Sequence, residues 1–431
     1  MGGEKQVLFG GVFWWIPSFV FMGTMSSLGA ACSGTDEPTG SMEQHGDVKI
    51  VHLRGTAYQM GLQHGRLLHD QLVAGAAFID DSSLWLMMDW AKDNGFVDDA
   101  IANSYPDVID ECRGMADGDE GVFTFEECMT LAYGDVIVEF MDHPSLACSQ
   151  FIVMDGATKD GRLLHGRNLD YDRMPFMEEN PVLFVREPKG KIPYVVVGFP
   201  GNVAPYTGMN AAGLSVASNE ANAVDDIDRT GRSHVQMVRE ILQDARSLGD
   251  AASFIESQDH MTAEIIVVAD GNAHKGAVFE MTANHVAVRH VDGHGLVYAT
   301  NHFVDPQMLD KCEPVGPGDS TWNRFERLGQ LLDPDGSDSL YGNLDIAAAI
   351  SILRDTYDVV TQETLDPNQA IDGATLANNG CIQSVVFDPA AGILYVALGS
   401  VPAMRHEYVG YSIGQLLSDP QAMAPEPASY P

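Results

Sequence analysis

The stretch from Leu146 to Asp172 constrains the fold most, because it places two apolar runs on either side of a turn and carries a cysteine at its start. The turn, Asp155 to Gly161, is rich in Gly, Asp and Lys, and this pattern predicts a β-hairpin. Cys148 would begin the first strand and Asp170 would end the second. Since a hairpin folds its ends together, the sequence predicts a thiol and a carboxylate at one end of it.

Cys148 has two interpretations. Free cysteines are usually buried and act as small hydrophobes. The alternative is a nucleophile, which needs a base and a charged partner nearby. If the bond between Ala147 and Cys148 were cut, the freed α-amine, with a pKa of about 7.7 to 8.0, could take the thiol proton near neutral pH. Arg167 and Asp170 would then orient the new N-terminus and balance its charge.

The run from Gly166 to Asp170, G-R-N-L-D, resembles the motif of bile salt hydrolases and penicillin V acylases, and is similar to acid ceramidase motifs. The run from Gly55 to Gly65, G-x-x-Y-x-x-G-x-x-H-G, resembles the opening of the isopenicillin N acyltransferase (acyl-CoA:6-aminopenicillanic acid acyltransferase) family. The chain after residue 47 thus resembles cysteine N-terminal-nucleophile (Ntn) hydrolases. This resemblance implies an α+β fold, a four-layer αββα sandwich. We expect the glycines of the second run to let a helix pack closely against the sheet.

The resemblance also implies roles for two asparagines. In related families the asparagine of a G-M-N bend, here Asn210, lies at the oxyanion site, but asparagine also suits the turn itself, and both interpretations stand. Asn301 follows a predicted strand in a T-N motif, and its side-chain amide would form part of the oxyanion hole and donate to the oxyanion, an interaction worth roughly 3 to 4 kcal/mol. A structural asparagine at a strand end is the alternative.

A predicted helix beginning at Ser320 carries the last candidate. Arg324, in its R-F context, resembles the site arginine of the bile salt hydrolases. Its neighbour Arg327 is expected to be a surface charge. Cys148, Arg167, Asp170, Asn210, Asn301 and Arg324 together form the predicted catalytic set.

Charge and cysteine usage limit the partners. The chain of 431 residues has 24 basic and 61 acidic residues, a net charge of −37. Such a surface repels nucleic acid and anionic membranes, which excludes nucleic acid as a partner but leaves a lipid anchor to the membrane possible. No cysteine spacing is typical of zinc, and no metal or cofactor is expected. Apart from Cys32 and Cys148, either two disulfides or four buried thiols are compatible with the remaining cysteines, which are Cys112, Cys128, Cys312 and Cys381.

Residues 1–32 have the pattern of an export signal and resemble a bacterial lipoprotein signal that ends at a lipidated Cys32. An ordinary signal peptide and an uncleaved anchor are the alternatives. The anchor stays open because a helix that spans a bilayer needs about 17 to 25 residues, and the apolar run is near the short end of this range. The sequence predicts export to the bacterial periplasm or cell envelope. Beyond the signal we expect a linker (33–46), a mainly helical segment (47–147), a catalytic chain (148–418) and a tail (419–431).

These observations predict an enzyme that cuts itself before Cys148 and whose small and large chains stay tightly bound. It would act as an amidohydrolase or N-acyltransferase on a small linear amide through a thioester. A transferase would also bind an acceptor amine or acyl-CoA. The rival hypothesis is a catalytically silent surface lipoprotein that uses the same fold for binding.

Overall fold

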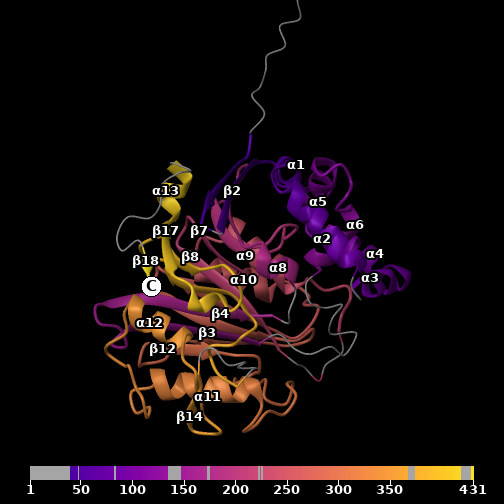
Figure 1. The fold of residues 1–431 in the computed structure, drawn as a ribbon. Helices are drawn as coiled ribbons and strands as arrows, with labels where there is room; N and C mark the ends of the chain where they lie inside the picture. Colours follow the sequence, from indigo (N-terminus) through magenta and orange to yellow (C-terminus); the bar gives the residue numbers. More distant parts are fainter. Residues whose placement is uncertain are drawn as a thin grey trace, which may run out of the picture. The chain divides into compact units, whose positions relative to one another are not determined.

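The computed structural model describes residues 39–46, 48–81, 84–133, 147–171, 175–221, 224, 227–366, 374–418 and 429–431 (Figure 1). The predicted signal with Cys32, the start of the predicted linker and residues 419–428 of the predicted tail lie outside the described residues. Residues 38–431 form one compact unit. In the part of the chain that is described, no helix is long and apolar enough to cross a membrane.

Two large sheets carry the fold. The nine-stranded sheet has the order β1-β2-β5-β6-β7-β8-β9-β10-β11, with every pair antiparallel except β2 and β5. Its strands are β1 Ser41–His45, β2 Val48–Gly55, β5 Val182–Pro188, β6 Tyr194–Gly198, β7 Thr207–Asn210, β8 Leu214–Glu220, β9 Glu264–Asp270, β10 Lys275–Met281 and β11 Val286–His290.

The seven-stranded sheet is antiparallel and has the order β12-β3-β4-β15-β16-β17-β18. Its strands are β3 Ala147–Asp155, β4 Gly161–Asp170, β12 Leu296–Ala299, β15 Cys381–Asp388, β16 Ile393–Ala397, β17 Tyr408–Ser412 and β18 Ser429–Tyr430; a separate small ladder joins β13 Tyr357–Asp358 to β14 Glu363–Thr364. The predicted hairpin is confirmed as β3 and β4, with Ala147 opposite Asp170 and Cys148 opposite Leu169.

Helices precede, separate and follow the strands, and their starts follow from local sequence. Thr56 and Gln59 form a capping box at the start of α1, Thr124 and Glu127 form another at α6, and Pro106 opens α5. In chain order the helices are α1 Ala57–Leu67, α2 His69–Asp81, α3 Leu84–Asp93, α4 Phe96–Asn103, α5 Pro106–Gly118, α6 Phe125–Ala132, α8 Pro175–Glu179, α9 His234–Asp244, α10 Leu248–Glu256, α11 Ser320–Leu332, α12 Ile346–Leu353, the 3₁₀ helix η1 Ala403–Arg405 and α13 Ile413–Ser418. The predicted helical character of the segment before Cys148 is therefore confirmed where it is described.

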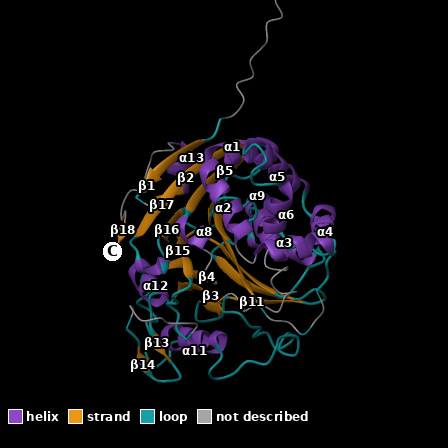
Figure 2. Ribbon diagram, turned by 45° about the vertical axis from the view of Figure 1, so that its right-hand side comes forward, coloured by secondary structure: helices purple, strands orange, loops and turns teal. Residues whose placement is uncertain are grey.

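Buried side chains show how the layers stack. One core lies between the sheets, where Met209 of the nine-stranded sheet and Phe387 of the seven-stranded sheet share a cluster. Ile241 of α9 packs on the outer face of the nine-stranded sheet, and Leu328 of α11 packs on the outer face of the seven-stranded sheet with Phe151. Figures 1 and 2 show α9 and α11 on opposite sides of the paired sheets. The order helix, sheet, sheet, helix confirms the predicted four-layer αββα architecture.

The glycines of α1 do not serve the contact that we expected. A Cβ on Gly61 would lie 2.0 Å from the carbonyl oxygen of Glu111 in α5, and a Cβ on Gly114 of α5 would lie 2.0 Å from the carbonyl oxygen of Tyr58 in α1. The expectation of close packing against the sheet is wrong. Glycines four residues apart share one helix face, and here that face meets a second helix with the same spacing.

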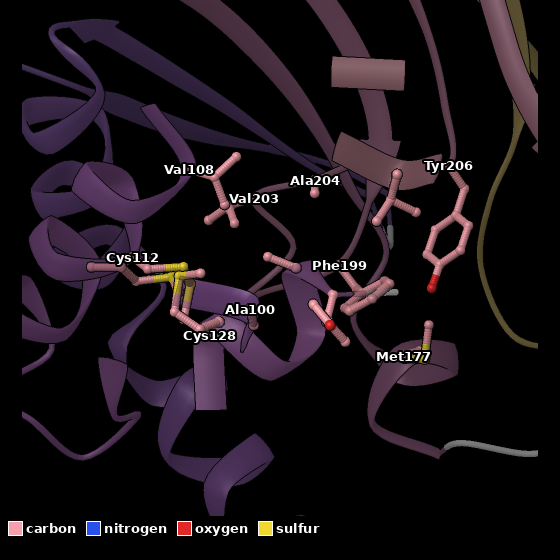
Figure 3. Close-up of a cluster of buried hydrophobic side chains, with 14 of the residues drawn as sticks. Ala100, Val108, Cys112, Cys128, Met177, Phe199, Val203, Ala204 and Tyr206 are labelled. Carbon is pink, nitrogen blue, oxygen red and sulfur yellow. A yellow bond between two sulfur atoms is a disulfide. The ribbon is translucent and has the colours of Figure 1, made fainter. Parts of the chain in front are cut away.

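Two further expectations need correction. The predicted linker, residues 33–46, contains strand β1, because its polar residues pair with β2 at the edge of the nine-stranded sheet. One disulfide, between Cys112 of α5 and Cys128 of α6 with Cα atoms 5.5 Å apart, is present, while Cys312 and Cys381 are free and buried. These four cysteines therefore form neither two disulfides nor four free thiols, which were the two expected alternatives. Figure 3 shows the disulfide in a buried cluster that also includes Met177 and Tyr206.

Candidate active site

The hairpin sets the directions of the candidate side chains. Residues alternate between the two faces of a strand, so Cys148 of β3 and Arg167 of β4 both face the nine-stranded sheet, where the guanidinium of Arg167 contacts β7 and β8. Asp170 lies on the opposite face of β4, in register with Ala147 on one side and with Cys381 of β15 on the other. The hairpin thus brings three predicted site residues together around the Ala147–Cys148 bond.

The thiol of Cys148 is buried against a fixed guanidinium. Arg167 Nη2 donates to Cys148 Sγ at 3.6 Å and to the carbonyl oxygen of Ser218 at 2.7 Å. Arg167 Nη1 donates to the carbonyl oxygen of Tyr206 at 3.0 Å and also to the hydroxyl of Thr207. Burial raises the pKa of Cys148 to about 11, although Arg167 opposes the shift. The thiol is therefore protonated at neutral pH and needs a base before it can attack.

The backbone of Cys148 is held by Asn301 and Arg324, which lie more than 150 residues further along the chain. Its N–H donates to Asn301 Oδ1 at 2.8 Å, and its carbonyl oxygen accepts a hydrogen bond from Arg324 Nη1. Arg324 Nη2 also donates to Asn301 Oδ1, at 2.9 Å. Asn301 and Arg324 therefore form a clamp on the residue that would carry the new N-terminus.

Asn301 is itself fixed by its neighbours. Its Nδ2 donates to the carbonyl oxygen of Glu220 at 2.8 Å, and its backbone N–H donates to Thr321 Oγ1 of α11 at 2.8 Å. In this geometry the amide oxygen of Asn301 binds the cysteine nitrogen. Its expected donation from the amide nitrogen to an oxyanion stays a prediction.

Asp170 is a buried carboxyl whose pKa is raised to about 7. Burial is the main cause, and the charge of Arg324, a hydrogen bond with the Cys381 thiol and the charge of Arg167 oppose it. A carboxyl with this pKa is partly protonated near neutral pH, so it can exchange a proton beside Ala147.

Asn210 does not belong to this group. Its Nδ2 donates to the carbonyl oxygens of Leu242 at 3.0 Å and Ala245 at 2.9 Å, and its Oδ1 accepts from the N–H groups of Ala212 and Leu214, both at 3.0 Å. The side chain holds the β7–β8 bend onto the end of α9. The oxyanion interpretation of Asn210 is therefore replaced by the turn interpretation.

Arg327 is not the surface charge that we expected. It is 6% exposed and pairs with Asp355 at 2.9 Å and Asp338 at 2.5 Å. Its helical position, three residues after Arg324, turns it toward these carboxylates rather than toward solvent.

Asn219 of β8 lies next to the site, which the sequence did not suggest. It lies between Ser218 and Glu220, whose carbonyl oxygens accept from Arg167 and Asn301 respectively. Its only sequence signal is its place in a polar run, S-N-E, that ends an apolar strand. Among the described residues, no group of three or more His, Cys, Asp and Glu side chains is arranged to hold a metal ion.

Comparisons with known proteins identify a family and several similar chains. The family model for acyl-coenzyme A:6-aminopenicillanic acid acyl-transferase matches residues 138–402. An uncharacterized protein of Archaeoglobus fulgidus is 28% identical over an alignment of 362 residues, which covers 72% of this chain and only 58% of that relative's length.

Three solved structures are also similar to the chain. The N-acylethanolamine-hydrolyzing acid amidase ortholog of Caenorhabditis elegans has 17% identity and a TM-score of 0.39, over 56% of this chain and 93% of that one. Penicillin V acylase of Agrobacterium tumefaciens has 12% identity and a TM-score of 0.39, over 64% and 90%. A mutant conjugated bile acid hydrolase of Clostridium perfringens has 14% identity and a TM-score of 0.39, over 57% and 88%.

Proposed function

The chain belongs to the acyl-coenzyme A:6-aminopenicillanic acid acyl-transferase family, and we propose that it is a self-processing cysteine Ntn enzyme that hydrolyses a linear amide or transfers its acyl group. The observation that carries this proposal concerns a single residue. The nitrogen of Cys148 is bound by Asn301 at 2.8 Å and its sulfur by Arg167 at 3.6 Å. An N-terminal nucleophile needs both atoms held in this way, because the nitrogen acts as the base for the sulfur.

Activation would begin at the Ala147–Cys148 bond. Cys148 Sγ gives up its proton and attacks the carbonyl carbon of Ala147, the C–N bond breaks, and the nitrogen takes up a proton. The resulting thioester is hydrolysed by water, which leaves a carboxylate on Ala147 and a free amine and thiol on Cys148. In this proposal the partly protonated Asp170, in register with Ala147, exchanges the proton, and Arg324 and Asn301 hold the new N-terminus.

Turnover of the substrate would repeat this chemistry with an external amide. The free amine of Cys148 takes the thiol proton, the sulfur attacks the substrate carbonyl, and the leaving amine is protonated as the thioester forms. We assign stabilisation of the oxyanion to the amide nitrogens of Asn301 and Asn219. Each amide nitrogen carries two N–H groups, of which one donates to a backbone carbonyl, that of Glu220 for Asn301 and that of Thr300 for Asn219. Water completes a hydrolysis, whereas an acceptor amine completes a transfer.

Intact mass and a denaturing gel test the proposal directly. Wild-type protein should give two chains divided before Cys148, and Cys148→Ala should give one. Cys312→Ser is the matched control, because Cys312 is also free and buried but lies outside the site; it should cleave and turn over amides normally. Cys112 cannot serve as this control, since it forms a disulfide. A single uncut wild-type chain without turnover would instead support the binding-protein hypothesis.

A panel of acyl amides, with and without an added amine, separates the two reactions. A transferase should form the new amide in proportion to the added amine, and a hydrolase should release the free acid regardless of it. Trapping of the acyl group on Cys148, read as a mass increase of the large chain, would identify the substrate class.

We further propose that the protein is exported and lipidated at Cys32. The signal-like composition of residues 1–32 supports this proposal, as does the disulfide between Cys112 and Cys128, because disulfides persist in oxidising compartments. Labelled fatty acid should be incorporated by wild-type protein and not by Cys32→Ser. Equal labelling of both would contradict lipidation at this residue.

A further inference from the structure

A chain of buried side chains crosses from one sheet to the other behind the nucleophile. Ser215 Oγ of β8 lies 2.9 Å from His165 Nδ1 of β4, and His165 Nε2 lies 3.0 Å from Gln150 Oε1 of β3. Gln150 Nε2 lies 2.5 Å from Asn219 Oδ1, and Asn219 Nδ2 lies 2.7 Å from the carbonyl oxygen of Thr300. Each of these five residues is at most 1% exposed.

The last acceptor fixes the direction of the whole chain. The carbonyl oxygen of Thr300 can only accept, so Asn219 must turn its nitrogen toward it and its oxygen toward Gln150. Gln150 must then donate through its nitrogen, and its oxygen faces His165. His165 must therefore carry a proton on Nε2, and its Nδ1 accepts from the hydroxyl of Ser215.

His165 is suited to this single state. Burial lowers its pKa to about 3, and the charge of Arg167 acts in the same direction, so the ring stays neutral across the physiological range. A neutral ring with Nε2 protonated is a donor on one side and an acceptor on the other.

The chain ends at the residues that hold Cys148. Gln150 lies two residues after Cys148 on the same face of β3. Asn219 joins β3 to Thr300, the residue before Asn301, and it is flanked by the carbonyl groups that bind Arg167 and Asn301. A change in the direction of either amide would be transmitted to Arg167 and Asn301, two of the residues that contact Cys148.

We propose that His165 is a positioning residue, which as the neutral Nε2–H tautomer fixes the amide directions of Gln150 and Asn219 and so places Asn301 and Arg167 around Cys148. This proposal rests on the proposed function, because its purpose is to keep that site in order. Without the donor at Nε2, Gln150 loses the partner that prevents its amide from flipping. Either the nitrogen or the oxygen of the Gln150 amide could then face Asn219.

Three substitutions at one position separate positioning from simple filling of the core. His165→Gln keeps a donor at the place of Nε2, His165→Asn keeps a polar group only at the place of Nδ1, and His165→Leu keeps neither. We expect His165→Gln to retain most of the turnover. His165→Asn and His165→Leu should lower kcat by roughly 10- to 100-fold, because small misplacements of reacting groups have effects of this size. KM should stay within about threefold if substrate binding is untouched.

The tautomer is a second readout that does not depend on activity. Nitrogen NMR of histidine-labelled full-length protein, with the His165 signal identified by its loss in His165→Gln, should show the proton on Nε2. Urea unfolding of each variant checks that it is folded. A proton on Nδ1, or equal kcat in folded Gln, Asn and Leu variants, would overturn the proposal.

The two proposals fail in different ways. If the wild-type chain neither cleaves itself nor turns over any amide, the proposed function fails, and the NMR experiment still decides whether the chain of hydrogen bonds has the stated direction. If the wild-type enzyme is active and the substitutions at His165 have no graded effect, the proposed function stands and the positioning role fails.

Discussion

Glu111 of α5, Arg186 of β5 and Arg239 of α9 form a buried ion triad, and Glu111→Gln is expected to weaken the fold strongly. One carboxylate oxygen lies 2.5 Å from Arg186 Nη1 and the other lies 2.8 Å from Arg239 Nη2, and the three side chains are 0 to 1% exposed. Each arginine has one more acceptor, the carbonyl oxygens of Asn202 at 3.1 Å and Val203 at 2.9 Å respectively. Neither of these acceptors replaces the lost negative charge.

The magnitude follows from the burial. Removal of one partner from a buried ion pair costs about 3 to 5 kcal/mol, because it leaves an uncompensated charge. Here one substitution leaves two buried arginines, so we expect the free energy of unfolding to fall by at least about 3 kcal/mol. A whole domain has about 5 to 15 kcal/mol, so the loss is a large part of the total.

Urea unfolding in a Cys148→Ala background measures the effect on a single uncut chain. The matched control is Glu126→Gln, which removes an exposed pair with Lys92, where the side chains are 49% and 60% exposed; such pairs contribute about 0 to 1 kcal/mol. Replacement of the whole triad by apolar residues of similar size should recover much of the loss, since no charge is then stranded. If Glu111→Gln changes stability as little as Glu126→Gln does, the reasoning about charge compensation is refuted.

Three other predictions concern the helix contact and the site. Gly61→Ala should lower the free energy of unfolding by several kcal/mol, because the new Cβ would meet a backbone oxygen at 2.0 Å. Gly249→Ala in α10, where the nearest atom would lie at 3.7 Å, should be neutral or slightly stabilising when both variants are measured by urea unfolding. The pKa of Asp170 is about 7 in the fold and about 3.9 unfolded, so the folded state binds more protons and stability should fall as pH rises from about 4 through 7, by up to about 4 kcal/mol. The urea midpoint of Cys148→Ala should fall as pH rises over this range, and the midpoint of the same chain with Asp170→Asn should not show this fall. Parallel plots of midpoint against pH for the two variants would contradict the assigned pKa. Arg324→Lys should slow self-cleavage at least tenfold, measured from timed gels, because an ammonium cannot bind the Cys148 carbonyl oxygen and Asn301 Oδ1 with the geometry of the guanidinium fork; an unchanged rate would remove Arg324 from the clamp.

Local sequence was sufficient for the hairpin and for part of the site. The turn between Asp155 and Gly161 is a signal within one short segment, and it places Cys148, Arg167 and Asp170 together. The contact between Cys148 and Asn301 joins residues 153 apart, and no periodicity reports such a contact. That part of the site came from the family resemblance, which names residues but not the atoms that meet.

The errors have a common physical origin in partners far along the chain. Asn210 was ambiguous because its decisive partners are the carbonyl groups at the end of α9, more than 30 residues away. The glycines of α1 predict a close contact with another element, but only the fold shows that this element is α5. Strand β1 has little apolar alternation of its own and exists because β2 offers it an edge.

The parallel pairing of β2 with β5 has a practical consequence for the production of the proposed large chain. A gene that starts at Cys148 would encode the amine and the thiol directly. Its product would lack β1 and β2, so the apolar strand β5 would become an exposed edge strand of the nine-stranded sheet. An exposed apolar edge strand can pair with strands of other chains, so this shortened product should aggregate and precipitate. In the proposed activation, the segment before Cys148 would therefore have to be present while the chain folds, and the enzyme is best obtained by expressing the whole chain and testing it for self-cleavage.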